Sequence, residues 1–250
     1  MTNDLPSGFW TPARQRDALV IALTVVTGAI DAIGFTRLGG VFTSVMTGNM
    51  VLLGVAAGKG GAVLAIHTGV AFSGFIAGSL AGAHLAGHAK KGDAFWPRPI
   101  LKALCVELLV LGVFAIWWEV VSGNPTGNAT YALLGINAVA LGIQSAAVLR
   151  FGISGLSTTY LTGTLTQLIA SLTKRDEPTV GRNVIILLAL IGGAALGALV
   201  ALRVPLAAPA VPLGFLAFVV ITAEIVFHRR MDVSPLPPST SVATDNPAIR

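Results

Sequence analysis

Two short motifs place hydroxyl and amide groups within apolar parts of this sequence. Their small and polar residues are Thr43, Thr47, Gly48 and Asn49 in the first motif, and Thr158, Thr162, Gly163 and Thr164 in the second. Hydroxyl and amide groups can replace the water around a small solute or an ion, so we expect these residues to form a binding site. The structural alternative is that they satisfy loose backbone groups or a neighbouring helix, as Ser and Thr commonly do in membrane proteins.

Asp31 and Gln144 precede the two motifs, each within an apolar stretch. An ionisable side chain inside a membrane segment is costly and marks a functional site by default. Asp31 is therefore predicted to contact the substrate, bind a cation or relay a proton. Its structural alternative is to cap the short segment that follows. Gln144 is predicted to line the same site, with hydrogen bonding between helices as its alternative.

Three more charged residues are predicted to couple or gate a transport step. Arg37 and Arg150 fall where apolar stretches end, so they could attract anions at two entrances, although such arginines more often extend to the lipid headgroups. Glu107 lies about two turns inside an apolar stretch, where it could carry a proton or pair with a loop lysine.

No enzyme motif accompanies these residues. The sequence holds no His-Glu-x-x-His pair, no phosphate-binding loop ending in Gly-Lys-Ser or Gly-Lys-Thr, and no Gly-x-Ser-x-Gly elbow. We therefore expect no enzymatic activity, no catalytic residue, no metal and no cofactor.

The elements that must position these residues are membrane helices. Hydrophobic residues make up 54% of the 250 residues and charged residues 11%, against about 25% charged residues in soluble domains. Six stretches approach the roughly 20 residues of helix that span a bilayer: Ala18–Phe35, Ala62–Gly87, Ile100–Val121, Tyr131–Leu149, Val184–Leu202 and Pro212–Phe227. Two shorter apolar stretches, Val41–Ala57 and Leu156–Leu172, contain the polar motifs.

The net charge of +5 does not indicate a nucleic-acid partner. The basic residues lie in short loops between apolar spans, where the positive-inside rule places them. No basic face with interleaved aromatic residues is present, so nucleic acid is excluded as a partner.

The two polar motifs belong to a predicted internal repeat. Ala29–Gly39 aligns with Gly142–Gly152, and Thr43–Asn49 aligns with Thr158–Thr164 after two inserted residues. The aligned pairs include Asp31 with Gln144, Arg37 with Arg150, Thr47 with Thr162 and Gly48 with Gly163. Each half then reads as a span, a short segment and two further spans.

The basic residues decide between eight spans, in which the short segments cross, and six, in which they dip in and return. Eight spans would put the basic loop 88–99 outside and the uncharged loop 122–130 inside, against the positive-inside rule. With six spans, only Arg37, Lys59 and Arg203 of the 16 basic residues lie outside. We therefore expect an all-α integral membrane protein with six transmembrane helices in two inverted three-helix repeats, each with a short re-entrant helix.

The predicted organisation follows from this topology, with both termini in the cytoplasm. It comprises a cytoplasmic tail at 1–17, a first membrane repeat at 18–121, an external loop at 122–130, a second membrane repeat at 131–230, and a disordered tail at 231–250.

The same motifs resemble the YoaK family of bacterial membrane proteins. Its first-half signature is similar to Gly28-Ala-Ile-Asp31-Ala, Val41-Phe42 and Met46-Thr47-Gly48-Asn49. Its second-half signature is similar to Gly142-Ile-Gln144-Ser-Ala, Thr158-Thr159 and Leu161-Thr162-Gly163-Thr164, with Asn often standing where this chain has Ser145. The resemblance covers residues 18–202. It implies a multi-pass protein of the bacterial inner membrane and brings no substrate or established activity.

Inverted repeats with broken helices near the membrane midplane are typical of secondary transporters. The sequence thus favours a secondary transporter or channel-like carrier, with its site between the Thr-Gly-Asn and Thr-Gly-Thr segments. The alternative is a non-transporting membrane scaffold, or a subunit that contacts lipid or stabilises a partner. The expected partners are the lipid bilayer and an unidentified small solute or ion, and a homo-oligomer stays open.

Overall fold

The computed structural model describes residues 11–89, 93–152, 158–159, 161–174 and 177–229, and every regular element in these ranges is a helix. In chain order the helices are α1 (Pro12–Arg37), α2 (Met46–Lys59), α3 (Ala62–Ala86), α4 (Arg98–Val120), α5 (Asn128–Leu149), α6 (Leu161–Lys174), α7 (Glu177–Arg203) and α8 (Ala210–Glu224). A 3₁₀ turn at Pro205–Ala207 precedes α8, and a π turn at Ile225–Arg229 follows it.

Six of these helices are long and apolar enough to cross a membrane: α1, α3, α4, α5, α7, and α8 together with its flanking turns. The prediction of an all-α chain with six membrane-spanning helices is confirmed to this extent. The predicted disordered tail at 231–250 and the first ten residues of the predicted N-terminal tail lie outside the described residues.

Local sequence signals explain where individual helices begin and end. Thr11 caps α1, because its hydroxyl accepts a hydrogen bond from the backbone N–H of Arg14 at 3.3 Å, and Pro12 occupies the first helical position. Gly60 ends α2 in the left-handed conformation, with a φ of +68°, which glycine adopts without steric cost.

The helices α2 and α6 are too short to cross a bilayer. Each has 14 residues, or about 21 Å of helix, against a hydrocarbon core about 30 Å thick. The sequence predicted the first short segment from Val41, but the helix begins only at Met46. Residues before it are not helical because the backbone N–H groups of Thr43 and Ser44 donate to a carboxylate on α1.

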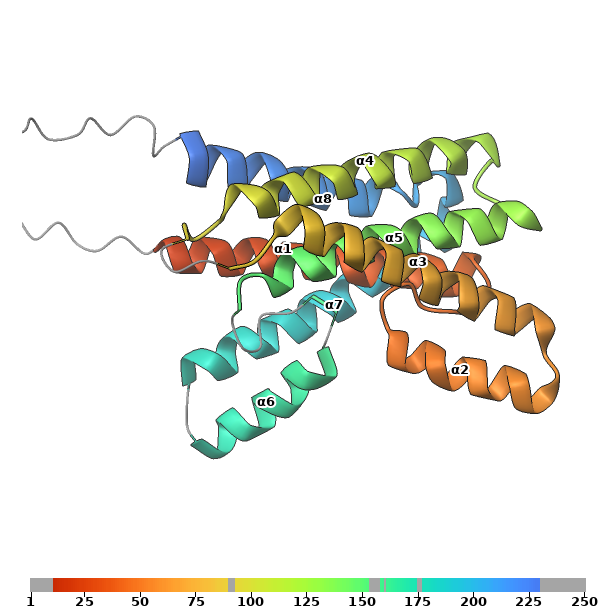
Figure 1. Cartoon of the computed structure of the whole chain (residues 1–250), viewed down its shortest axis with the longest axis horizontal. Helices are drawn as coiled ribbons and strands as arrows, with labels where there is room; N and C mark the ends of the chain where they lie inside the picture. Colours follow the sequence, from red (N-terminus) through yellow and green to blue (C-terminus); the bar gives the residue numbers. More distant parts are fainter. Residues whose placement is uncertain (1–10, 90–92, 153–157, 160, 175–176, 230–250) are drawn as a thin grey trace, which may run out of the picture.

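Figure 1 shows how the helices are arranged. Both ends of the described chain lie at the left end of the bundle, and α2 lies at the opposite end, where α1 finishes and α3 begins. The second short helix, α6, lies at the left end, where α7 begins. The closest helix pairs each join one helix from each half of the chain: α1 with α7, and α3 with α5.

Glycines allow α1 and α7 to pack backbone against backbone. A Cβ atom at Gly193 would overlap the carbonyl group of Val25, and one at Gly197 would overlap the backbone of Ala29. A Cβ atom at Gly28 would in turn overlap the backbone of α7. Such small residues are what membrane helices use for close approach.

The pair α3 and α5 is built in the same way. A Cβ atom at Gly78 would overlap the carbonyl group of Val139, and one at Gly82 would overlap the backbone of Ile143. A Cβ atom at Gly142 would overlap the backbone of α3.

The two interfaces correspond to each other residue by residue. Replacing α1 by α5 and α7 by α3 carries the first set of glycine contacts onto the second, with Gly142 in the place of Gly28, Gly78 in the place of Gly193 and Gly82 in the place of Gly197. The remaining contacts follow the same exchange, since α8 packs on α1 as α4 packs on α5, and α6 packs on α7 as α2 packs on α3.

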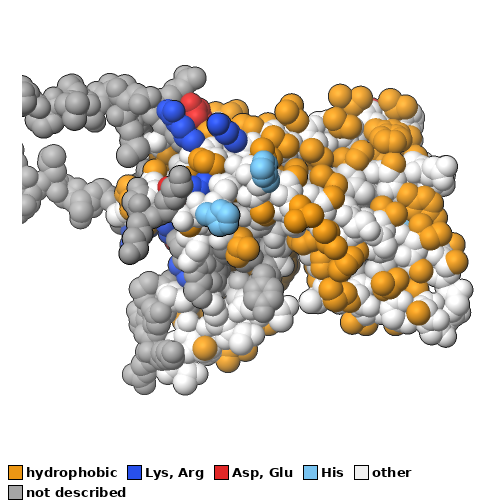
Figure 2. All heavy atoms as spheres, in the orientation of Figure 1, with side chains coloured by type: hydrophobic (Ala, Val, Ile, Leu, Met, Phe, Trp, Pro, Cys, Tyr) orange, Lys and Arg blue, Asp and Glu red, His pale blue; other side chains and the backbone are white. Residues whose placement is uncertain are grey.

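The outer surface is apolar over most of its length. Large side chains such as Leu80, Leu109 and Val120 are about 70% exposed. Figure 2 shows hydrophobic side chains over the centre and right of this face, while Lys, Arg, acidic and His side chains gather at the left end. Exposed apolar area of this extent suits contact with lipid rather than water.

Gly192 and Gly193 give a direct test of the close packing between α1 and α7. Gly193→Ala should destabilise the protein by about 1–3 kcal/mol, because its methyl group would overlap Val25. Gly192→Ala should be neutral or stabilising, because nothing lies within 4 Å of that position and Ala favours helix over Gly by up to about 1 kcal/mol. Thermal unfolding of both variants in detergent measures the difference, and equal melting temperatures would contradict the described interface.

Candidate functional site

Asp31 closes the loop between α1 and α2. Its Oδ1 accepts hydrogen bonds from the N–H of Thr43 at 2.7 Å, the hydroxyl of Thr43 at 2.8 Å and the N–H of Ser44 at 2.9 Å, and its Oδ2 accepts from the hydroxyl of Ser44 at 2.5 Å. The side chain is only 6% exposed. These four donors replace the water that the buried carboxylate has lost.

This clamp draws non-helical backbone into the bundle. Asp31 precedes the last residue of α1 by six positions, which corresponds to about 9 Å along the helix axis. The chain therefore leaves the end of α1, turns back along it and starts α2 from within the bundle.

Asn49 holds the other side of the same loop. Its side-chain amide donates to the carbonyl oxygen of Phe42 at 2.6 Å, and its Oδ1 accepts from the N–H of Phe42 at 3.1 Å. Asn49 is fully buried, whereas Thr47 is exposed and Gly48 is half-buried. The structure thus brings Thr43 and Asn49 into the loop region with Asp31, but not Thr47.

The second motif has the same pattern of burial. Thr158 and Thr164 are buried, Gly163 is half-buried and Thr162 is exposed. The hydroxyl groups of Ser145 on α5 and Thr159 lie 2.7 Å apart and share a hydrogen bond.

Ser145, and not Gln144, occupies the position that matches Asp31. Gly142 corresponds to Gly28 by its contacts, and Ser145 follows Gly142 by three residues just as Asp31 follows Gly28. The pairing of Asp31 with Gln144 in the sequence alignment is therefore wrong by one residue.

The error in register has a structural cause. The alignment is anchored on Arg37 and Arg150, which do correspond in their contacts but not in their helical position. Arg37 is the last residue of α1, whereas α5 ends at Leu149 and Arg150 is its cap. One fewer residue therefore separates the arginine from the glycine contact in the second half.

Gln144 instead joins α5 to α1. Its side-chain N–H₂ group donates to the hydroxyl of Thr27 at 2.8 Å and to the carbonyl oxygen of Leu23 at 3.2 Å. The residue is fully buried, and its Oε1 has no hydrogen-bond partner. Of the two sequence hypotheses for Gln144, these contacts favour hydrogen bonding between helices.

Arg37 and Arg150 cap helices of the opposite half. The guanidinium of Arg37 donates to the carbonyl oxygen of Ala201 near the end of α7, at 2.8 and 3.0 Å. Arg150 donates to the carbonyl oxygen of Ala86 at the end of α3, and also to the carboxylate of Asp93 at 2.9 Å. A cation at a helix C-terminus is favourable because carbonyl groups there lack intrahelical partners. A gating role for these arginines stays a prediction.

Glu107 lies fully buried on α4, and neither carboxyl oxygen has a hydrogen-bond partner. The ion pair with a loop lysine that the sequence offered as an alternative is not formed among the described residues. Asn137 on α5 and Asn183 on α7 are also fully buried with unpartnered side-chain amides. Sequence reasoning missed both, because Asn137 lies inside the predicted span Tyr131–Leu149 but is not ionisable, and Asn183 directly precedes the predicted span Val184–Leu202.

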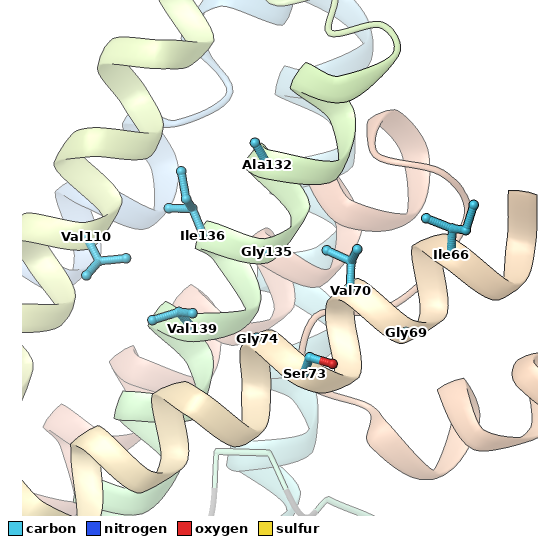
Figure 3. A pocket seen from close by; sticks show the side chains of 10 residues that line it. All are labelled: Ile66, Gly69, Val70, Ser73, Gly74, Val110, Ala132, Gly135, Ile136 and Val139. Carbon is cyan, nitrogen blue, oxygen red and sulfur yellow. The ribbon is translucent and has the colours of Figure 1, made fainter.

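One hollow in the described surface lies away from both motifs. It has a volume of about 650 Å³ and opens between α3, α4 and α5 (Figure 3). Its lining is apolar apart from Ser73, and comprises Ile66, Gly69, Val70, Ser73, Gly74, Val110, Ala132, Gly135, Ile136 and Val139. A second hollow of about 420 Å³ lies where α1 and α7 begin, and Arg14, Asp17 and Arg182 contribute to its wall.

Metal binding finds no support in the described parts of the chain, where no three His, Cys, Asp or Glu side chains come close enough together to hold an ion.

Comparison with known proteins supports the membrane assignment without adding a substrate. Over residues 19–222 the chain matches the family described as "Protein of unknown function (DUF1275)". It is 37% identical over 165 residues to "UPF0700 transmembrane protein YoaK" of Bacillus subtilis (strain 168), which covers 66% of this chain and 71% of that protein. No solved structure matches the chain.

The hydrogen bonds of Asp31 and of Ser145 to their loops should contribute unequally to the free energy of unfolding. Asp31→Ala should destabilise the protein by about 3 kcal/mol or more, because two buried N–H groups and two hydroxyls lose a charged acceptor. Ser145→Ala should cost about 1 kcal/mol, because one neutral hydrogen bond is lost. Thermal unfolding in detergent compares the two variants, and a similar loss for both would rule out Asp31 as the principal clamp.

Proposed function

Because the chain belongs to the DUF1275 family of membrane proteins of unknown function, we propose its activity from its geometry, as a secondary transporter or channel-like carrier of a small solute. Its site lies between the two loops that precede α2 and α6. No enzymatic activity is part of this proposal.

The observation that carries the proposal is non-helical chain held inside the bundle. Asp31 holds it through the backbone N–H groups of Thr43 and Ser44 in one half, and Ser145 holds it through the hydroxyl of Thr159 in the other. Loose backbone at membrane depth is tolerated only where it is buried in protein or lines a wet cavity. Secondary transporters use such interrupted helices to bind substrates near the midplane. On this reading α2 and α6 are re-entrant helices that open toward opposite faces of the membrane, in keeping with their places at opposite ends of the bundle (Figure 1).

The proposal includes two inverted repeats, α1–α4 and α5–α8. The matching glycine contacts of α1 with α7 and of α5 with α3 support the repeat. Each half contributes three long helices and one short one. With an odd number of crossings per half, the second half runs through the membrane in the opposite sense.

The two loop clamps, Asp31 with Thr43 and Ser44 and Ser145 with Thr159, start from α1 and α5, which contact each other. Gln144 and Thr27 lie at that contact and are joined by a hydrogen bond of 2.8 Å. The solute would meet hydroxyl and amide groups from both halves, including those of the Thr-Gly-Asn and Thr-Gly-Thr segments. Glu107 is the proposed coupling group, because it is fully buried and has no partner that would occupy its carboxyl oxygens.

The basic residues support an orientation with both termini in the cytoplasm of the bacterial inner membrane. The end of the bundle that holds the described termini carries Arg14, Arg16, Arg98, Lys102, Arg150 and Arg182. The opposite end carries Arg37, Lys59 and Arg203. Cytoplasmic loops hold the excess of Lys and Arg in most membrane proteins.

A second candidate function is a non-transporting membrane scaffold. Two observations favour it. The polar groups of Asp31 and Thr43 satisfy each other and those of Asn49 are satisfied by the backbone of Phe42, and the hollow between α3, α4 and α5 is apolar and suits a lipid chain (Figure 3).

The topology can be tested by thiol labelling. In a Cys105→Ser background, Gly58→Cys should react with an impermeant thiol reagent in intact cells, because the end of α2 would face outward. Ala89→Cys, at the end that holds the termini, should react only after the cells are permeabilised. Both positions are exposed, so accessibility to the reagent is set by the side of the membrane. The reverse labelling pattern would refute the proposed orientation.

Transport can be tested in liposomes. Purified protein should speed the volume change of liposomes over that of protein-free liposomes for at least one small solute in a panel of formate, chloride, urea, glycerol and ammonium salts. In the Cys105→Ser background, a methanethiosulfonate reagent should block this flux at Ser145→Cys, because the added group fills the proposed site. The same reagent at Ala89→Cys is the control and should leave flux unchanged. Flux equal to that of protein-free liposomes for every solute would favour the scaffold.

A further inference from the structure

The two loop clamps differ in their number of acceptor oxygens, because the carboxylate of Asp31 has two and the hydroxyl of Ser145 has one. The hydrogen bond of 2.5 Å between Asp31 Oδ2 and the Ser44 hydroxyl has its counterpart in the bond of 2.7 Å between the Ser145 and Thr159 hydroxyls. Asp31 also offers Oδ1, which accepts three hydrogen bonds in the first half. Ser145 has no atom that corresponds to Oδ1.

At the matching position of the second half, a buried hydroxyl has no hydrogen-bond acceptor. Thr43 donates its hydroxyl to Asp31 Oδ1 at 2.8 Å. Its counterpart in the aligned second motif is Thr158, which is 1% exposed and whose hydroxyl has no hydrogen-bond partner. Few buried polar groups stay unsatisfied in native proteins, because each costs about 1–3 kcal/mol.

The N-terminus of α6 lies next to this position in the chain and favours negative charge there. In the first half the carboxylate of Asp31 bonds to Ser44, and α2 begins two residues later at Met46. In the second half α6 begins at Leu161, two residues after Thr159, with no acidic residue in its first turn. The free N–H groups and the dipole at a helix N-terminus favour negative charge.

We propose that Ser145, Thr158 and Thr159 form a binding site for a small monovalent anion, such as formate or chloride, which takes the place that Asp31 Oδ1 fills in the first half. The inference rests on the repeat in the proposed function, and together with transport it makes the solute a small anion. A carboxylate oxygen or a halide accepts several hydrogen bonds at once, as Asp31 Oδ1 does. A cation is disfavoured, because these three residues supply no carboxylate.

The site is tested by thermal unfolding of the detergent-purified protein at constant ionic strength. Sodium formate or sodium chloride replaces the sodium salt of a bulky sulfonate buffer, MES. The melting temperature of the unsubstituted protein should rise saturably with formate or chloride, because an anion that binds only the folded state stabilises it. Ser145→Asp should raise the melting temperature in MES alone and abolish the further rise, because it supplies the missing oxygen covalently.

Thr43 and Thr158 provide matched variants. Thr43→Val should lower the melting temperature in MES, because it removes the bond to Asp31. Thr158→Val should leave it unchanged or raised, because the lost hydroxyl had no partner, and should abolish the response to anions. A loss of stability in Thr158→Val as large as that in Thr43→Val would overturn the proposal, because the hydroxyl would then already be satisfied.

An unchanged melting temperature of the unsubstituted protein in formate, chloride and MES would also overturn it and would leave an ordered water as the occupant. This readout does not depend on flux. If neutral solutes cross the liposome membrane but anions do not change the melting temperature, the anion site is refuted and transport is supported. If anions raise the melting temperature saturably but no solute shows flux, the anion site is supported and transport is refuted.

Discussion

The structure depends on one constraint: backbone groups buried inside the helix bundle must find hydrogen-bond partners within the protein. Asp31 meets that constraint for the loop before α2, with four hydrogen bonds to Thr43 and Ser44. Asn49 meets it from the other side of the loop by pairing with both backbone groups of Phe42. Without these partners the chain between α1 and α3 would have to stay at the surface, and α2 would have no fixed place in the bundle.

The glycine interfaces set the distances at which those polar contacts form. Gly28 and Gly193 let α1 and α7 approach until their backbones touch, and Gly78 and Gly142 do the same for α3 and α5. The capping arginines depend on this approach, because Arg37 reaches the end of α7 only when α1 lies directly against it. Small residues and buried polar groups therefore act together, the first bringing backbones close and the second fixing where each helix stops.

Hydropathy was sufficient to predict the six long helices, because lipid selects for runs of apolar residues whatever their partners. It also located the short segments, although the start of α2 at Met46 depends on hydrogen bonds to Asp31 that span the loop. The match of Ser145 to Asp31 could not be predicted from the sequence, because the arginines that anchor the alignment occupy different positions relative to their helix ends. The contact of Arg37 with Ala201 joins residues from opposite halves of the chain, which no local pattern encodes.

The pairing of α1 with α7, and of α3 with α5, has a consequence for how the protein is made. When the first half has entered the membrane during synthesis, α1 still lacks the helix that covers its glycine face, because α7 has not yet been translated. The groove at Gly28 must then be filled by lipid or by the insertion machinery and emptied again later. Final assembly is thus a post-insertion event in which both halves close together, and neither half is a stable folding unit by itself.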